Sequence, residues 1–177
     1  RDAVARLHLH PIPTDPAMPS YTPDDLMEGR CPEGQTVALY DDDHFYMGSV
    51  LAELLIAKGN RVHFVTPAVK VAEWTDNTLE QGTIMRRLLE IGVEVHLSKA
   101  PEAIGAREVT LGCTWTGRQT ALPCEAVVLV TSRSPNDALF HETRALDWQG
   151  AGIKTLKLIG DAAAPGPIAW ATYAGRM

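Results

Sequence analysis

The most regular pattern of hydrophobic and polar positions in this chain runs from Thr36 to Pro67. Val37–Tyr40 is a short apolar run that ends in polar residues, which is typical of a buried strand. Apolar positions then fall at helical spacing from Tyr46 to Lys58, and Val62–Thr66 is a second apolar run. A strand, a helix and a strand within about thirty residues predict a βαβ unit, whose strands are parallel.

The same pattern continues toward the C-terminus. Thr78–Ile91 has the spacing of a helix, and Gly92 ends it. Val93–Leu97 alternates strictly between apolar and polar residues, so a third strand extends the unit to βαβαβ. The side chains expected to face inward from the helix are Leu79, Ile84, Leu88 and Leu89.

Short β elements follow from Lys99 onward. Glu108–Thr116 and Gln119–Pro123 are the two strands of a predicted hairpin with Gly117 at its tip. Ala126–Thr131 is a continuous apolar run, as expected for a fully buried strand. The chain is then expected to form a short helix, a last strand and a final helix, at Asp137–Trp148, Ile153–Ile159 and from Ile168 on.

The first 33 residues are rich in proline and predict little regular structure. Asp2–Leu9 could be one edge strand, and Thr22 with Pro23 is a helix start that Gly29 stops. His8 and His10 would share one face of that strand, but no third ligand lies nearby. The sequence therefore predicts no metal site here.

The turn after the first strand is where a dinucleotide-binding fingerprint, G-x-G-x-x-G, would lie. Gly48 matches the last glycine, but Asp41–Asp43 holds the first two glycine positions. Three carboxylates would repel a pyrophosphate. The position that should carry an acidic residue for the ribose is Thr66. We therefore expect no NAD(H) or NADP(H) to bind at this turn.

A second candidate nucleotide site lies near the C-terminus. A predicted strand, Gly160-Asp161, a turn of small residues and a helix start at Ile168 would present free amides and the helix dipole to an anion. Asp161 would accept a hydrogen bond from a ribose or ribitol hydroxyl. The alternative is that Asp161 only caps the helix. The candidate cofactor-binding residues are Gly160, Asp161 and Ile168, and no catalytic residue is predicted.

Composition excludes several classes of protein. A net charge of −6 over 177 residues gives no basic surface for nucleic acid. The sequence contains no run of about eighteen apolar residues, so it predicts no membrane span. Three cysteines, far apart and odd in number, argue against a disulfide framework and against a thiolate metal cluster. They favour a reducing compartment, so we expect a cytoplasmic protein.

Four blocks of this sequence carry a resemblance to a known family. They are HLHPIPTDPAMPSYTPDDLMEG, TVALYDDDHFYMGSVLAELLIAKGNRVHFVTPA, VLVTSRSPNDALF and LIGDAAAPGPIAWATYAGR. In order, they resemble the C-terminal part of the trimethylamine, dimethylamine and histamine dehydrogenase family. The resemblance implies an α/β fold, disulfide-reductase-like, with a Rossmann-like parallel sheet, crossover helices and a small antiparallel β element.

The resemblance also implies a domain division. Residues 1–33 would be a linker and a returning segment of an FAD-like domain, residues 34–121 an NAD-like Rossmann insert, and residues 122–177 the C-terminal part of the FAD-like domain. Members of the family carry FMN and an iron–sulfur cluster on an N-terminal TIM barrel, and ADP or FAD behind it. The barrel, the cluster cysteines and the glycine-rich half of the FAD-like domain are absent from this sequence.

The expected function follows from that resemblance. The chain would be a fragment of a flavin and iron–sulfur amine dehydrogenase, or of another NADH:flavin oxidoreductase of the same build. It would supply nucleotide-binding-like architecture with no chemistry and no bound cofactor of its own. The parent would pass electrons from an amine to an electron-transfer flavoprotein and would be a homo-oligomer. Two alternatives stay open: a module that docks an electron-transfer partner, and a stand-alone NAD(P)-binding reductase domain.

Overall fold

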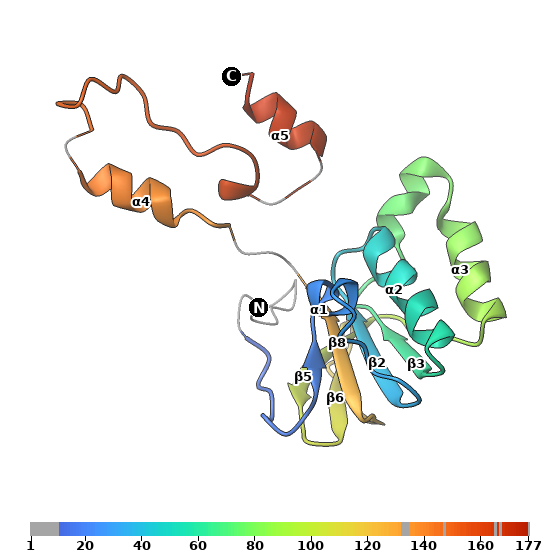
Figure 1. Ribbon diagram of the computed structural model, residues 1–177. Coiled ribbons are helices and arrows are strands. Elements are labelled where there is room, and N and C mark those ends of the chain that lie inside the picture. Colours follow the sequence, from blue (N-terminus) through green and yellow to red (C-terminus); the bar gives the residue numbers. More distant parts are fainter. Residues whose placement is uncertain (1–10, 132–134, 147, 165, 167, 177) are drawn as a thin grey trace. The chain divides into compact units, whose positions relative to one another are not determined.

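The computed structural model describes residues 11–131, 135–146, 148–164, 166 and 168–176. The chain divides into two compact units, Arg1–Ser132 and Arg133–Met177 (Figure 1). The predicted edge strand at Asp2–Leu9, with His8 and His10, lies outside the described residues.

The first unit is built on a five-stranded sheet in which every neighbouring pair of strands is parallel. The strand order is β1-β8-β2-β3-β4. In that order the strands are Ser20–Tyr21, Ala126–Val130, Thr36–Asp41, Arg61–Val65 and Glu94–His96. The parallel sheet predicted from the sequence is thus confirmed.

Strand β8 places two distant segments side by side. Val37–Asp41 of β2 pairs in register with Ala126–Val130, and β1 pairs with the other edge of β8. The parallel sheet therefore includes a strand from beyond residue 121. The assignment of residues 1–33 and 122–177 to an FAD-like domain, and of residues 34–121 to an NAD-like insert, stays a prediction.

Helices cover one face of this sheet (Figure 1). They are α1 (Pro23–Met27), α2 (Tyr46–Ala57) and α3 (Gln81–Glu90), with a 3-10 helix, η1, at Glu73–Thr78. Their apolar side chains pack with alternate residues of the strands in one core; its members include Leu39, Leu51, Leu55, Phe64, Leu88 and Val128.

Two of the four side chains predicted to face inward from α3 do not. Leu79 is 92% exposed and Leu89 is 55% exposed, whereas Leu88 is fully buried. The reason for Leu79 is that η1 ends there with a left-handed residue, φ +62°, so α3 begins only at Gln81. Leu89 is rotated by about 100° from Leu88 around the helix and so points away from the sheet.

A three-stranded antiparallel sheet covers the opposite face of the parallel sheet. Its strands are β5 (Lys99–Ile104), β6 (Glu108–Cys113) and β7 (Gln119–Pro123). They pack on the other alternate residues of the parallel strands in a second core; its members include Ala38, Tyr40, Val65, Ile104, Leu111 and Val127. The first unit therefore has three layers: helices, parallel sheet and antiparallel sheet.

Helix α1 begins as the sequence predicts. The amide of Asp25 donates to Thr22 Oγ1 at 3.2 Å, and the amide of Thr22 donates to the Asp25 carboxylate at 2.7 Å. This reciprocal capping box satisfies two amides that the helix start leaves without partners. The Arg30 guanidinium beside Asp25 holds the pKa of that carboxyl well below its usual range.

The second unit contains α4 (Ala138–Ala145), a 3-10 helix η2 (Gly160–Ala162) and α5 (Ile168–Ala174). The predicted strand at Ile153–Ile159 is wrong for this chain, because the described part of the unit forms no strand there or elsewhere. A strand needs a neighbouring strand for its backbone hydrogen bonds. Ile153 and Ile159 are 42% and 51% exposed.

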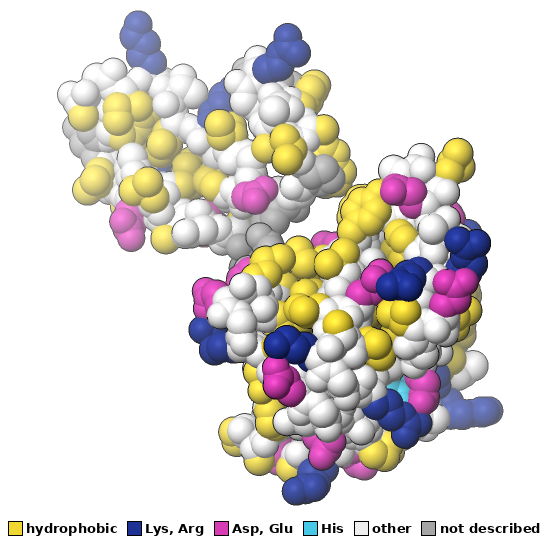
Figure 2. Space-filling model, turned by 45° about the vertical axis from the view of Figure 1, so that its right-hand side comes forward, with side chains coloured by type: hydrophobic (Ala, Val, Ile, Leu, Met, Phe, Trp, Pro, Cys, Tyr) yellow, Lys and Arg dark blue, Asp and Glu magenta, His cyan; other side chains and the backbone are white. Residues whose placement is uncertain are grey.

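Many large apolar side chains of this second unit are exposed, and none of its helices buries a residue. Figure 2 shows them as yellow side chains spread over its surface. The large ones are Leu139, Leu146, Ile153, Ile159, Ile168, Trp170 and Tyr173. Among the described residues of the whole chain, no helix has the length and apolar character that crossing a membrane requires.

Candidate functional site

The turn between β2 and α2 lies at the carboxyl end of the parallel sheet, where open α/β sheets bind their ligands. Asp41 closes β2 and is fully buried, and Asp42 is 5% exposed. A Cβ on Gly48 would lie 2.7 Å from Cγ of Asp41, so helix α2 approaches the strand closely only because residue 48 is glycine. The predicted role of Gly48 as the last glycine of a Rossmann turn fits this contact.

The carboxyl group of Asp41 has an unusually high pKa. Burial raises its pKa to about 7, the charges of Asp43 and Asp42 act in the same direction, and the charge of His44 opposes them. Its Oδ2 atom is buried without a hydrogen-bond partner. A carboxyl group that is costly to ionise therefore stands where a nucleotide-binding turn presents backbone amides.

His44 completes the buried part of this turn. Its side chain is 2% exposed, and Nε2 lies 3.4 Å from Oδ1 of Asp42. Its backbone is left-handed, with φ +62°, a conformation that glycine adopts much more readily. The sequence did not identify His44, because a histidine gives no local signal for a positive φ.

Aromatic side chains cover the start of helix α2. Phe45 is the N-cap residue and makes no side-chain capping bond. The Trp74 ring stacks on the Phe45 ring with centroids 5.8 Å apart, and the Trp74 amide donates to His44 O at 3.1 Å. Trp74 is therefore held over the start of α2 by both a ring contact and a backbone hydrogen bond. Thr66, where an acidic residue would hold a ribose, is fully buried.

The second candidate site, Gly160, Asp161 and Ile168, lies in the second unit. Gly160 has φ +58°, so a left-handed backbone favours glycine there. The carboxylate of Asp161 is exposed and accepts a long hydrogen bond, 3.4 Å, from the amide of Gly166. Ile168 is the first residue of α5 and is 83% exposed. Their predicted binding role stays a prediction.

The residues His63, Glu94 and His96 form a third cluster, which the sequence did not predict. Nδ1 of His63 lies 3.1 Å from Nε2 of His96 and 3.4 Å from Oε2 of Glu94. Burial lowers the pKa of both histidines, so neutral imidazole is favoured. Both predicted strands contain these residues, but only the pairing register of β3 with β4 places the three side chains on one face.

Comparisons of sequence and of structure identify relatives that align with nearly the whole chain. Dimethylamine dehydrogenase from Hyphomicrobium sp. (strain x) is 30% identical over 93% of this chain. Histamine dehydrogenase from Rhizobium sp. 4-9 is 51% identical over 99% of it, with a TM-score of 0.89. The 6-hydroxypseudooxynicotine amine oxidase from Pseudomonas geniculata N1 is 37% identical over 99%, with a TM-score of 0.86.

The chain spans only about a quarter of these relatives: 25% of the dimethylamine dehydrogenase, 28% of the histamine dehydrogenase and 26% of the amine oxidase. A flavoprotein disulfide reductase from Escherichia coli shares the fold over 94% of this chain, with a TM-score of 0.60 and 17% identity. The predicted disulfide-reductase-like α/β fold is confirmed.

Residues 21–116 match the OYE-like second alpha/beta domain, and this match covers more than half of the chain. It begins at β1 and ends just after β6, so it includes the acidic turn, Gly48 and the histidine cluster. The chain therefore belongs to the OYE-like second alpha/beta domain family and is homologous to dimethylamine and histamine dehydrogenases.

Proposed function

We propose that this chain is the C-terminal part of a flavin and iron–sulfur amine dehydrogenase, in which it supplies nucleotide-binding-like architecture and no reacting group. The observation that carries the proposal is the similarity to histamine dehydrogenase over 99% of this chain and 28% of the relative. The other two relatives named above are an amine dehydrogenase and an amine oxidase.

The exposed apolar surface of the second unit supports a role inside a larger protein. Ile168 is 83% exposed and Trp170 is 63% exposed, on a helix that buries no side chain. Large apolar patches on a soluble protein usually mark a surface that another element covers. An N-terminal barrel and the other half of an FAD-like domain, both in the longer protein, are the proposed covering elements.

The acidic turn supports the absence of a nicotinamide cofactor from the first unit. Asp41 and Asp42 stand where a pyrophosphate would need backbone amides, and the Phe45–Trp74 stack covers the start of α2. Both features disfavour the alternative of a stand-alone NAD(P)-binding reductase. No observation on the described residues singles out a surface for an electron-transfer partner.

The nucleotide of the parent, ADP or FAD, is assigned to the second unit. Gly160 gives the backbone a left-handed turn, and the exposed Asp161 carboxylate accepts one long hydrogen bond, 3.4 Å, from the amide of Gly166. Its second oxygen can accept a hydrogen bond from a ribose or ribitol hydroxyl, with Ile168 at the start of the helix beyond it. FMN and the iron–sulfur cluster would reside on the missing barrel of a cytoplasmic, homo-oligomeric parent that reduces an electron-transfer flavoprotein.

The longer protein that contains this chain provides the test. We expect it to hold FMN, an iron–sulfur cluster and one adenine nucleotide, released on denaturation and identified by chromatography. Asp161→Ala should weaken nucleotide binding by about 1.5–3 kcal/mol, the usual loss for a hydrogen bond to a charged group. Glu142→Ala, which removes an exposed carboxylate of the same unit, is the control and should leave nucleotide content unchanged.

Two outcomes would refute parts of this proposal. Full nucleotide occupancy and affinity in Asp161→Ala would restrict Asp161 to a capping role. A longer protein without flavin, or without amine-dependent reduction of a dye, would exclude the amine dehydrogenase assignment. The 177-residue chain alone should be colourless and inactive in the same dye assay.

A further inference from the structure

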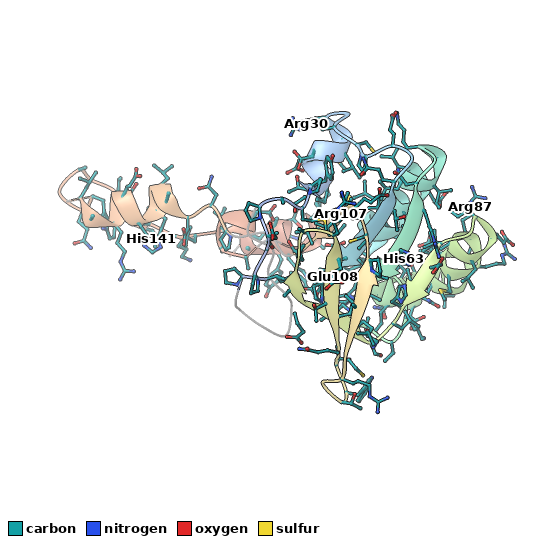
Figure 3. The ribbon with its side chains drawn as sticks, turned by 90° about the horizontal axis from the view of Figure 1, so that it is seen from below. Arg30, His63, Arg87, Arg107, Glu108 and His141 are labelled. Atoms are coloured by element: carbon teal, nitrogen blue, oxygen red, sulfur yellow. The ribbon has the colours of Figure 1, made fainter. Side chains whose placement is uncertain are left out.

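We propose that His63, Glu94 and His96 form a binding site for one Zn²⁺ ion at the edge of the parallel sheet. The three residues come from the neighbouring strands β3 and β4, and their ligand atoms all lie within 4.8 Å of one another. Figure 3 labels His63 on β3. This inference is independent of the proposed function.

Two of the three distances between ligand atoms are close to those of a tetrahedral site, and all three lie within 4.8 Å. Ligand atoms bound to zinc at 2.0–2.1 Å in tetrahedral geometry lie about 3.3–3.4 Å apart. The observed separations are 3.1 Å from His63 Nδ1 to His96 Nε2 and 3.4 Å from His63 Nδ1 to Glu94 Oε2. Two imidazole nitrogens and one carboxylate oxygen are a ligand set that zinc commonly takes.

The strand register fixes these side chains before any ion binds. His63 lies directly opposite Glu94, and His96 follows two residues later on the same face of β4. His63 is 6% exposed, whereas the Glu94 side chain is 47% exposed. The site is thus closed toward the sheet and open toward solvent, which leaves room for a water molecule as fourth ligand.

Neighbouring cations orient the site and also limit its affinity. Nε and Nη2 of Arg61 both donate to Oε1 of Glu94, which leaves Oε2 directed at His63. Such hydrogen bonds to a ligating carboxylate hold it in place. The positive charge of Arg61 lowers the pKa of His63, and that of Lys99 lowers the pKa of His96. The same two charges repel a bound cation. Lys99→Gln should therefore tighten zinc binding.

The competing explanation is purely structural. The two imidazoles could share one hydrogen bond between neutral rings and so join β3 to the short edge strand β4. That role needs no ion. The two explanations differ in whether zinc binds to the protein with one ion per chain and whether its binding depends on these residues.

Calorimetric titration of the 177-residue chain with zinc chloride tests the proposal. We expect one ion per chain and a higher melting temperature with zinc present, because a ligand that binds only the folded state stabilises it. Loss of a group that only hydrogen-bonds to a metal ligand typically weakens metal affinity by about 10–100-fold. His96 is a direct ligand, so His96→Gln should weaken zinc binding by about 100-fold or more. Glu94→Gln should also weaken it, by at least about tenfold.

Control variants separate this site from other histidines. His141→Gln removes an exposed histidine of the second unit, and His8→Gln/His10→Gln removes the N-terminal pair; both should bind zinc with unchanged affinity. Equal losses in these controls, or unchanged binding in a folded His96→Gln, would overturn the proposal. So would the absence of binding by the wild-type chain.

A measurement on the wild-type chain avoids reliance on variants that fail to fold. Nuclear magnetic resonance of the histidine rings should show the resonances of His63 and His96 shifting with one equivalent of zinc, while those of His141 stay in place. Shifts confined to other histidines would also overturn the proposal.

Discussion

The side chain of Asp41 fills the space that a Cβ on Gly48 would need: the added atom would lie 2.7 Å from Cγ and 2.8 Å from Oδ1 of Asp41. Strand β2 and helix α2 therefore meet through a glycine and a buried carboxyl group. The close packing expected of a Rossmann turn is kept here, although the residue at the end of the strand is acidic. This contact makes the turn a sensitive place for substitution.

Gly48→Ala should destabilise the first unit by about 1–3 kcal/mol, the usual cost of forcing an extra carbon into a packed site. Gly82→Ala is the matched control, because Gly82 is also helical and a Cβ there meets no atom within 4 Å. The control should gain about 0.5–1 kcal/mol from the better helix propensity of alanine. Chemical denaturation of both variants measures the difference, and equal effects would contradict the contact.

Asp41→Asn should change how stability depends on pH. The pKa of Asp41 is about 7 in the folded chain and 3.8 for the unperturbed group. The folded state therefore binds this proton more tightly, so its contribution is fully present below pH 4 and is lost as the pH rises through 7. Linkage puts the loss at up to about 4 kcal/mol.

The measurement is the difference in free energy of unfolding between Asp41→Asn and the wild-type chain at each pH from 4 to 8. Asparagine cannot ionise, so the variant should gain relative to the wild type as the pH rises. Comparison at each pH removes the contributions of other carboxyl groups, such as Glu33, whose pKa its ion pair with Lys58 lowers. A difference that is constant across this range would show that Asp41 ionises normally.

Leu88→Ala and Leu89→Ala should differ sharply although the residues are adjacent. Leu88 is fully buried in the core between helices and sheet, so its truncation should cost about 2–5 kcal/mol. Leu89 is 55% exposed, and its truncation should stay within about 0.5 kcal/mol. Thermal or urea denaturation checks the pair. Similar losses of stability in the two variants would mean that α3 turns a different face toward the sheet.

Neither NAD(H) nor NADP(H) should bind the first unit. The buried Asp41 side chain fills the turn beside Gly48, and Thr66 offers no carboxylate to the ribose. Calorimetric titration of the 177-residue chain with each cofactor should give no heat of binding. Micromolar affinity for either one would overturn this prediction and restore the reductase alternative.

The periodic part of the fold could be predicted from the sequence because its interactions are local or repeated. Strand β2, helix α2 and strand β3 each have an apolar pattern long enough to fix their type, and glycines mark where helices end. The phase of α3 was predicted wrongly at Leu79, because a 3-10 helix precedes it and shifts its start. The strand predicted at Ile153–Ile159 failed because the described part of its unit contains no second strand to accept and donate its backbone hydrogen bonds.

The candidate sites were less predictable, because they depend on contacts between distant residues. The acidic turn was visible as a departure from a known spacing, but the burial of Asp41 and the left-handed His44 required the packed structure. His63 and His96 are 33 residues apart in sequence and meet only through the register of β3 and β4. A single histidine on a predicted strand carries no such information.

The position of β8 determines when the first unit can fold during synthesis. Ala126–Val130 lies between β1 and β2, so the two-residue β1 has no neighbour in the sheet until residue 130 has left the ribosome. Strands β2, β3 and β4 can pair earlier, with β2 exposing an unpaired edge in the meantime. Such edges recruit other chains. We expect nascent chains that stop before residue 126 to aggregate, and chains that extend beyond residue 131 to be soluble.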